Sequence, residues 1–484
     1  MKRIVMLCVS VLSAVTVCMS SFACKAYADN TGGDIYERID GYLRSCAENA
    51  HIPALTAAIA DSDKIVFANA YGDCESCDTP FVLGSVSKSF TAVCVMRLAE
   101  QGLIDLNDNI SAYLPDTTDG DRITVRQLLN HTSGLGEHQT LENCHIINEQ
   151  GVHHYANVNY SLLGKIIERV TGSAFDEYVT ANVIEPLGLA NTAASYQMSA
   201  ENGLIDGNTD YWGFSVKSSP KYPVSDNAWI TVPAGYISSS ANDLARYLQM
   251  YLRGGEGIIS RQSIDTMFYG DTVFVDGDVP YRYGYGWAAV SEPLPEPVLR
   301  HSGLVETGTS CVFIIPGKQL AVAVTANVND YFVANEMMDS LGWGIILMLL
   351  GEEPEMISPD AYILEHIRID LIMLAVFAAA IIPFFFIPAY KKRVGRKHYI
   401  SAVISALIVN IALPALILLI VPVFFQTPLW VAKAFVPDVY ITVLASSSLL
   451  FIGGAVRAVI IIEDIRHSRR PAERSNGHSQ YRYR

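Results

Sequence analysis

Charged residues are scarce in this chain of 484 residues, at 17%, and basic residues are the scarcer kind. The 34 lysines and arginines are outnumbered by 49 aspartates and glutamates, which gives a formal net charge of −15. Residues 29–365 hold most of the acid, so this part of the chain lacks the basic surface of a nucleic-acid-binding domain. We therefore expect no nucleic-acid partner. Internal repeats and low-complexity tracts are also lacking, and the length exceeds one ordinary domain.

Cysteine is absent from the C-terminal quarter of the chain, and three of the nine cysteines lie in its first 28 residues. Those residues have a basic start, an apolar run and the small-x-small site Ala26-Tyr27-Ala28, which is typical of a secretory signal. We predict cleavage after Ala28, with an uncut anchor as the alternative. Outside the cytosol disulfides are permitted, but the sequence does not fix a pairing. The six remaining cysteines are Cys46, Cys74, Cys77, Cys94, Cys144 and Cys311.

Three long apolar runs near the C-terminus predict membrane-spanning helices. Residues 369–390, 399–425 and 439–462 are each long enough to cross about 30 Å of hydrocarbon at about 1.5 Å per residue. Basic residues cluster after the first run and after the third run, and basic segments next to membrane spans usually face the cytoplasm. The domain before the first run is then expected on the extracytoplasmic side of the membrane, as the secretory signal also requires.

These features predict four parts of the chain. They are a signal peptide at 1–28, a folded domain at 29–365, a three-helix transmembrane domain at 366–465, and a basic cytoplasmic tail at 466–484. The expected location is the cell membrane, with several spans, membrane lipid as a partner and the folded domain extracytoplasmic. Arg457 interrupts the third run and either reaches the inner headgroups or marks a functional intramembrane site.

Residues 29–365 have the pattern of an α+β fold with one antiparallel sheet, flanking helices and a helical insert. Residues 195–232 have little periodicity, and we expect a long loop region there. The expected hairpin strands are 54–60 and 64–71, the later strands are 283–287, 299–303, 310–315 and 319–326, and the expected helices are 35–50, 91–101, 159–171, 175–184, 244–253 and 335–350.

The stretch from Phe81 to Phe90 predicts a strand, a glycine turn and the start of an apolar helix. Ser85 falls at the helix start and Lys88 three residues later, which places both side chains on one face. A hydroxyl needs a neighbouring group to take its proton before it becomes a good nucleophile. A lysine beside it, partly buried, has a lowered pKa and can do this. Taken alone, the pattern is common, and serine is also a frequent helix cap.

Two later motifs offer matching groups. Tyr155-Ala156-Asn157 supplies a phenol for proton relay and an amide for holding a substrate amide. His301-Ser302-Gly303 lies on an expected strand, where a strand edge can pair with an extended substrate and glycine permits close approach. Each motif is weak by itself.

In this order, Ser-x-x-Lys, Tyr-x-Asn and His-x-Gly make the chain resemble the penicillin-recognising serine hydrolases of the class C β-lactamase type. This group includes D-Ala-D-Ala carboxypeptidases, D-aminopeptidases and related esterases. The resemblance runs from about residue 34 to 350. It also includes Leu128-Leu129-Asn130-His131-Thr132-Ser133-Gly134-Leu135, Leu163-Gly164 and Tyr283-Gly284-Tyr285-Gly286-Trp287. It implies a β-lactamase/transpeptidase-like sheet with a helical subdomain.

The resemblance also implies roles for single residues. Ser85 is the expected nucleophile, Lys88 and Tyr155 handle protons, and Asn157 binds the substrate amide. His301, Ser302 and Gly303 line the far wall. The backbone N–H groups of Ser85 and Leu304 are the expected oxyanion donors. Whether Lys88 or Tyr155 is the main base stays open.

One departure from many such β-lactamases is His301, where they have lysine. A neutral histidine attracts a substrate carboxylate less than an ammonium does. Members of the similar family with histidine there include peptidases acting on D-residues and esterases, so the resemblance favours a peptidase-like hydrolase over antibiotic hydrolysis. The three C-terminal helices resemble the layout of membrane peptidases that remove N-acyl-D-amino-acid caps from secreted natural products, such as the colibactin-maturing peptidase.

We therefore predict an extracytoplasmic serine hydrolase that acts on small peptides or acylated substrates through an acyl-enzyme. An esterase or β-lactamase, and a sensor acylated without turnover, are the alternatives. His145, His153 and His154 near Cys144 lack regular ligand spacing, so we predict no metal and no cofactor.

Overall fold

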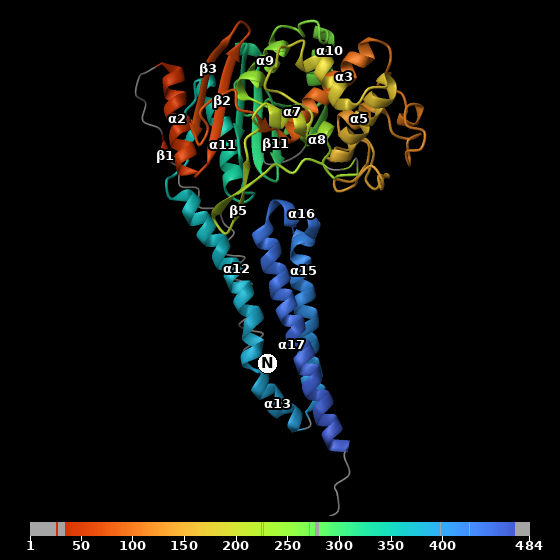
Figure 1. Cartoon of the computed structure of the whole chain (residues 1–484), viewed down its shortest axis with the longest axis vertical. Helices are drawn as coiled ribbons and strands as arrows, with labels where there is room; N and C mark the ends of the chain where they lie inside the picture. Colours follow the sequence, from red (N-terminus) through yellow and green to blue (C-terminus); the bar gives the residue numbers. More distant parts are fainter. Residues whose placement is uncertain are drawn as a thin grey trace, which may run out of the picture. The chain divides into compact units, whose positions relative to one another are not determined.

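The computed structural model describes residues 26–27, 34–223, 225, 227–270, 272–275, 280–396, 398–424 and 426–469 (Figure 1). The chain divides into two compact units that meet in sequence between Ile367 and Arg368, here called the N-terminal and C-terminal units. Most of the predicted signal peptide and all of the tail beyond residue 469 lie outside the described residues. Two residues of the predicted signal, β1 (Ala26–Tyr27), pair with β15 (Glu355–Met356).

The N-terminal unit is built on an eight-stranded antiparallel sheet in the order β3-β2-β13-β12-β11-β10-β9-β8. Its strands β2, β12 and β13 are almost entirely buried, because helices cover both of their faces. The predicted α+β architecture is confirmed. The strand bounds are β2 (Ala54–Asp61), β3 (Ile65–Gly72), β8 (Val273–Val275), β9 (Tyr281–Tyr283), β10 (Ala288–Val290), β11 (Val298–Val305), β12 (Gly308–Ile315) and β13 (Leu320–Ala326).

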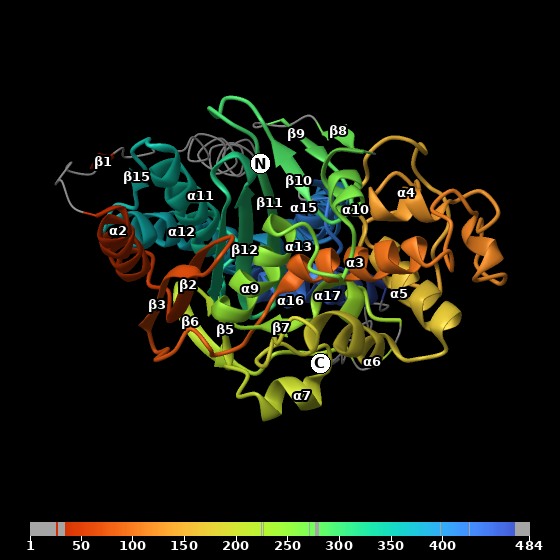
Figure 2. The same ribbon diagram turned by 90° about the horizontal axis from the view of Figure 1, so that it is seen from above.

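Helices α2 (Ile35–Asn49) and α11 (Ala334–Leu350) cover one face of the sheet, and α9 (Ala241–Leu252) covers the other (Figure 2). Small side chains let α9 lie close to β2, where Ala58 and Ala60 pack against Ala241 and Ala245. Beyond α9, a helical subdomain completes the main core. Its helices are α3 (Ser87–Glu100), α4 (Val125–Leu129), α5 (Asn157–Thr171), α6 (Phe175–Val179), α8 (Val232–Gly235) and α10 (Arg261–Asp265).

Two sequence-based expectations were wrong. The predicted loop region 195–232 contains α7 (Tyr196–Glu201) and the hairpin of β5 (Gly207–Tyr211) and β6 (Phe214–Ser218), and β5 pairs in parallel with β14 (Val328–Asn329). The predicted strand 283–287 is instead the turn between β9 and β10. Gly286 has a φ of +73° there, a left-handed conformation that glycine adopts readily.

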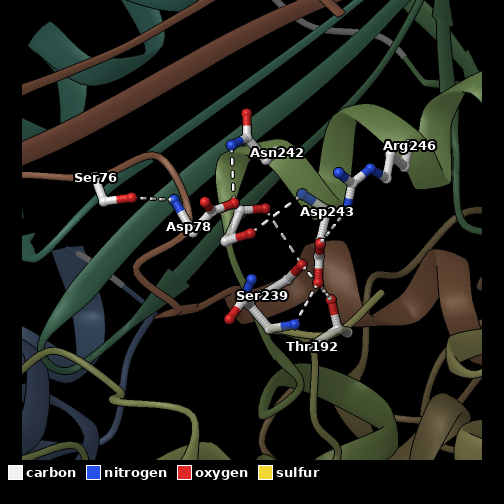
Figure 3. A network of polar contacts seen from close by, with 9 residues as sticks. Ser76, Asp78, Thr192, Ser239, Asn242, Asp243 and Arg246 are labelled. Atoms are coloured by element: carbon white, nitrogen blue, oxygen red, sulfur yellow. Dashed lines mark hydrogen bonds and ion pairs between the residues drawn. The ribbon is translucent and has the colours of Figure 1, made fainter. Parts of the chain in front are cut away.

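A buried polar network holds the start of α9 (Figure 3). The Ser240 side chain caps the helix by accepting from the Asp243 N–H at 3.1 Å. The Asp243 carboxylate is fully buried and accepts from the Asn191 N–H at 2.7 Å and the Thr192 hydroxyl at 3.0 Å. Thr192 also contacts Ser239 of β7 (Ser238–Ser239), which pairs with β4 (Phe81–Val82) just before Ser85.

Replacing Asp243 by alanine should lower the free energy of unfolding by about 1–3 kcal/mol, because buried donors lose their acceptor. The measurement is thermal or denaturant unfolding of the purified chain. Asp78→Ala is the matched control, since exposed Asp78 makes a single side-chain contact, with Asn242, in the outer part of the network. Equal losses of stability in the two variants would contradict the assignment.

The C-terminal unit consists of helices, and three segments are long and apolar enough to cross a membrane: Ala361–Gly395, Tyr399–Val423 and Pro437–Ser468. The first segment begins within the N-terminal unit. The helix bounds are α12 (Ala361–Phe385), α13 (Ile387–Gly395), α14 (Tyr399–Leu407), α15 (Leu413–Phe424), α16 (Leu429–Phe435) and α17 (Pro437–Arg469), and the turn Ile408–Ala412 joins α14 to α15.

Arg457 lies inside the C-terminal unit and is only 5% exposed. Its guanidinium donates to the Asn410 side-chain oxygen at 2.9 Å and to the Pro383 carbonyl at 3.3 Å. Asn410 in turn packs against Gly453 and Gly454, where larger residues would collide with it. The side chain therefore joins three helical segments instead of reaching out to headgroups.

Candidate active site

The turn that carries Ser85 is pressed against the sheet. Gly84–Val86 forms a single 3₁₀ turn between β4 and α3, and Gly84 has a φ of +57°. A Cβ on Gly84 would clash with the Leu304 backbone nitrogen, and a Cβ on Gly303 would clash with the Leu83 carbonyl. Both glycines are therefore required for the turn and strand β11 to lie backbone against backbone.

Lys88 follows on the first turn of α3 and is completely buried. Its Nζ lies 2.9 Å from the Ser85 Oγ, 2.8 Å from the Asn157 side-chain oxygen and 2.7 Å from the Ala234 carbonyl oxygen. Burial lowers the pKa of Lys88 well below its usual value, which favours the neutral amine. A neutral amine has two N–H donors, which Asn157 and Ala234 accept, and its lone pair is left for the Ser85 hydroxyl.

Tyr155 lies beside this pair. Lys88 Nζ is 4.9 Å from the centre of the Tyr155 ring. Burial raises the pKa of Tyr155, and the nearby Ser85 side chain partly offsets this rise. The phenol is thus protonated at neutral pH. With the pKa of Lys88 lowered and that of Tyr155 raised, Lys88 is the easier proton acceptor of the two.

His131 positions the Tyr155–Asn157 segment. Its Nδ1 accepts from the Ala156 N–H at 3.2 Å and lies 2.9 Å from the Asn159 side-chain nitrogen. The ring centres of His131 and Tyr155 are 4.3 Å apart. Burial lowers the pKa of His131 well below its usual value, so the ring is neutral.

His301 is buried on β11, and both of its ring nitrogens have partners. Nδ1 lies 2.8 Å from the Ser302 carbonyl oxygen and Nε2 lies 3.0 Å from the Tyr283 hydroxyl. Burial lowers the pKa of His301 to about 3. The wall at this position is therefore uncharged at neutral pH.

An open strand edge and a cavity lie next to Ser85. In the described part of the sheet, β10 pairs with β11 only as far as Arg300, so residues 301–305 pair on one side alone, with β12. A cavity of about 250 Å³ extends from Ser85 along β11 and β12 to α11. Its lining residues are Ser85, Ser302, Gly303, Leu304, Thr309, Ser310, Cys311, Asn335, Met338 and Asp339.

Two side chains place polar groups in the lining of this cavity. Thr309 is 5% exposed, and its hydroxyl oxygen has no hydrogen-bond partner among the described residues. Asp339 accepts from the Ser302 hydroxyl at 3.1 Å and from the Arg300 guanidinium at 3.0 Å. The arginine balances the charge of Asp339 in an ion pair, so this carboxylate adds little net charge to the cavity.

The structure brings together the predicted residues Ser85, Lys88, Tyr155 and Asn157, and it places Gly303 and Leu304 against the turn of Ser85. Ser302 points toward Asp339 and lines the cavity. The functions predicted for these residues remain predictions.

Sequence reasoning assigned no function to His131, Tyr283 or Ala234. His131 and Tyr283 lie in segments that carried the family resemblance, but their contacts depend on the fold. Ala234 contributes a backbone oxygen, which has no side-chain signal in the sequence.

Possible metal ligands lie elsewhere. Within the described residues, the group whose ligand atoms all lie within 4.8 Å of one another is Asp210, Asp330 and His366. None of these three lines the cavity beside Ser85.

A lysine buried against a serine at the edge of an antiparallel sheet defines a class of serine hydrolases with the β-lactamase fold. A model of the family described as Beta-lactamase matches residues 39–340, and the chain belongs to this family.

Several other proteins are similar to the chain. "Protein flp" of Staphylococcus aureus (strain NCTC 8325 / PS 47) is 25% identical over 331 residues, which cover 62% of this chain and 64% of that protein. The chain thus matches less than two thirds of that relative. "Beta-lactamase-like protein 2" of Dictyostelium discoideum is 23% identical over 290 residues, 52% of each chain. An octameric penicillin-binding protein homologue from Pyrococcus abyssi superposes with a TM-score of 0.58 at 25% identity, covering 68% of this chain and 79% of that one.

The lowered pKa of Lys88 predicts how the reactivity of Ser85 depends on pH. The amine is a base only when deprotonated, so the rate of labelling by a fluorophosphonate should rise with pH and level off well below the usual lysine pKa of about 10.5. Lys88→Met should slow labelling about 10²–10⁴-fold. Lys88→Arg, which keeps a charge but cannot act as a base, should be equally slow. A rate that still climbs near pH 10, or a reactive arginine variant, would contradict this role.

The lowered pKa of His301 predicts that the folded protein loses stability as the pH falls. In the unfolded chain this histidine takes up a proton at about pH 6.5, whereas in the folded protein its pKa is about 3. Acidification between these values therefore favours unfolding, by at most about 1.4 kcal/mol per pH unit. Unfolding curves at pH 7 and pH 5 should show a smaller loss for His301→Gln than for the wild type. His154→Gln, at a partly exposed position, serves as the control and should keep the wild-type loss.

Proposed function

We propose that this chain is a membrane-anchored, extracytoplasmic serine hydrolase that cleaves peptides containing D-residues or N-acyl-D-amino-acid caps through an acyl-enzyme. The observation that carries the proposal is the 2.9 Å approach of a buried lysine amine to the Ser85 Oγ. Three apolar segments of sufficient length support the anchor. The outward orientation rests on the basic segments that follow the first and third spans.

In the proposed reaction, the Ser85 Oγ attacks the scissile carbonyl and its proton passes to the neutral Lys88 amine. The carbonyl electron pair moves to the oxygen, which the backbone N–H groups of Ser85 and Leu304 stabilise. When the intermediate collapses, the C–N bond breaks and the proton passes from Lys88 through the Tyr155 hydroxyl to the leaving amine. An ester on Ser85 remains, and Lys88 is neutral again.

Deacylation reverses these proton transfers. A water molecule gives its proton to the Lys88–Tyr155 pair and attacks the ester carbonyl. Collapse of the second intermediate returns a proton to Ser85 and releases a carboxylic acid. Overall, one water is consumed and one amide bond is broken.

The shape of the site supports a short, extended substrate. The unpaired edge of β11 can bind a peptide backbone as an added strand, and Asn157 can hold a substrate amide. The cavity of about 250 Å³ next to Ser85 accommodates a small side chain, with the Thr309 hydroxyl as a hydrogen-bond partner. A neutral His301 reduces the attraction for the carboxylate of a β-lactam antibiotic, which favours peptide cleavage.

Turnover of matched substrates by the full chain in detergent tests this proposal. The wild type should hydrolyse an N-acyl-D-alanyl or D-Ala-D-Ala peptide at least about tenfold faster than its L counterpart, a difference of about 1.4 kcal/mol in activation free energy. Ser85→Ala should abolish both turnover and fluorophosphonate labelling. Ser225→Ala, at an exposed position, should leave both unchanged.

Other outcomes distinguish the alternatives. Labelling without turnover indicates a sensor that is acylated once. Faster cleavage of short acyl esters than of peptides of equal length indicates an esterase, and efficient penicillin hydrolysis indicates a β-lactamase. Undiminished labelling of Ser85→Ala would remove Ser85 as the nucleophile.

A further inference from the structure

A cluster of three metal-binding side chains lies outside the active site. Asp210 is on β5, Asp330 follows β14, and His366 is on the second turn of α12, all within the N-terminal unit. They are 9%, 3% and 7% exposed, respectively. The cluster thus joins a hairpin, the loop before α11 and the helix that leads out of the unit.

Each of the three groups is held in place by contacts around it. The Asp210 carboxylate accepts from the Gly213 N–H at 3.1 Å, and the Asp330 carboxylate accepts from the Ala334 N–H at 3.1 Å. The imidazole of His366 lies against Gly213, where a Cβ would come within 3.3 Å of the ring, and 4.5 Å from the ring centre of Tyr362. Such outer contacts orient the ligands in protein metal sites.

The spacing of the donor atoms suits a small divalent cation. The Nε2 of His366 is 2.9 Å from the Oδ2 of Asp330, and the ligand atoms of all three residues lie within 4.8 Å of one another. Ligands about 2.0–2.2 Å from a tetrahedral or octahedral ion are about 3.0–3.5 Å apart. Ligand atoms this close to one another need only small movements to reach one ion.

The chemistry of the three groups points the same way. One imidazole with two carboxylates is a donor set that suits Zn²⁺ and related first-row ions.

We propose that Asp210, Asp330 and His366 bind one divalent transition-metal ion, with Zn²⁺ as the best match. The ion has a structural role and is separate from the hydrolytic reaction at Ser85. His366 lies three residues before the apolar run that starts at residue 369, so the ion fixes the first turns of α12 to the N-terminal unit.

Metal binding by the full-length chain in detergent, purified without a histidine tag and stripped with EDTA, tests the proposal. Calorimetric titration should show one equivalent of Zn²⁺ bound, and Co²⁺ should give a visible absorption band from the same site. Zn²⁺ should raise the Tm of the wild type. Asp210→Asn, Asp330→Asn and His366→Ala should each lose the band and the Tm shift.

His51→Ala is the matched control, since the centre of the His51 ring lies 4.7 Å from that of Tyr362 but His51 is not one of the three proposed ligands. It should keep the band and the Tm shift. Asp210→Asn preserves side-chain shape, so it separates loss of the ion from loss of the fold, which circular dichroism reports. A wild type that binds no Zn²⁺, with a Tm insensitive to Zn²⁺ and EDTA, would overturn the proposal. Binding that persists in the Asp210 and Asp330 variants would overturn it as well.

Discussion

The burial of the Lys88 amine against the Ser85 hydroxyl is the contact on which the rest of the site depends. An ammonium at this depth would lose its hydration, whereas a neutral amine needs only two acceptors, and the fold supplies two. One is the side chain of Asn157 at the start of α5, and the other is the carbonyl of Ala234 in α8. Two helices from distant parts of the chain, α5 and α8, thus favour the neutral form of the Lys88 amine on α3. The proposed chemistry follows from that protonation state, because the free lone pair of Lys88 faces the Ser85 hydroxyl, which loses its proton in the first step.

A second constraint links this centre to strand β11. Gly84 and Gly303 let the Ser85 turn and β11 meet without side chains between them, and the Ser310 hydroxyl donates to the Leu83 carbonyl at 2.6 Å. Ser85 and the open edge of β11 are therefore held in one arrangement, as the proposed positioning of a substrate requires. On the other side of Ser85, His131 positions the segment from Tyr155 to Asn157 by accepting a hydrogen bond from the Ala156 N–H.

Local patterns in the sequence correctly predicted that Ser85 and Lys88 lie together, and they predicted most of the helices. The spacing of Ser85 and Lys88, the long apolar runs and the helix periodicity act over short distances, where geometry follows from sequence. Contacts between distant segments were harder to predict from the sequence. The buried aromatic residues Tyr285 and Trp287 have the alternating pattern of a strand, but they lie in a turn that contains Gly286 and their side chains pack into the core. The β5–β6 hairpin was missed because its residues are polar on β5 and largely exposed on β6. Nothing in the local sequence of Arg457 pointed to Asn410 as its partner.

The protonation state of Lys88 is the most direct test of the account. Selective ¹³C labelling of lysine, with the Lys88 resonance assigned by its loss in a methionine variant, reports the charge of this amine as pH is changed. The account predicts the shift of a neutral amine at pH 7 and a midpoint well below the usual lysine value. An ammonium at pH 7 that titrates near about 10.5 would contradict it.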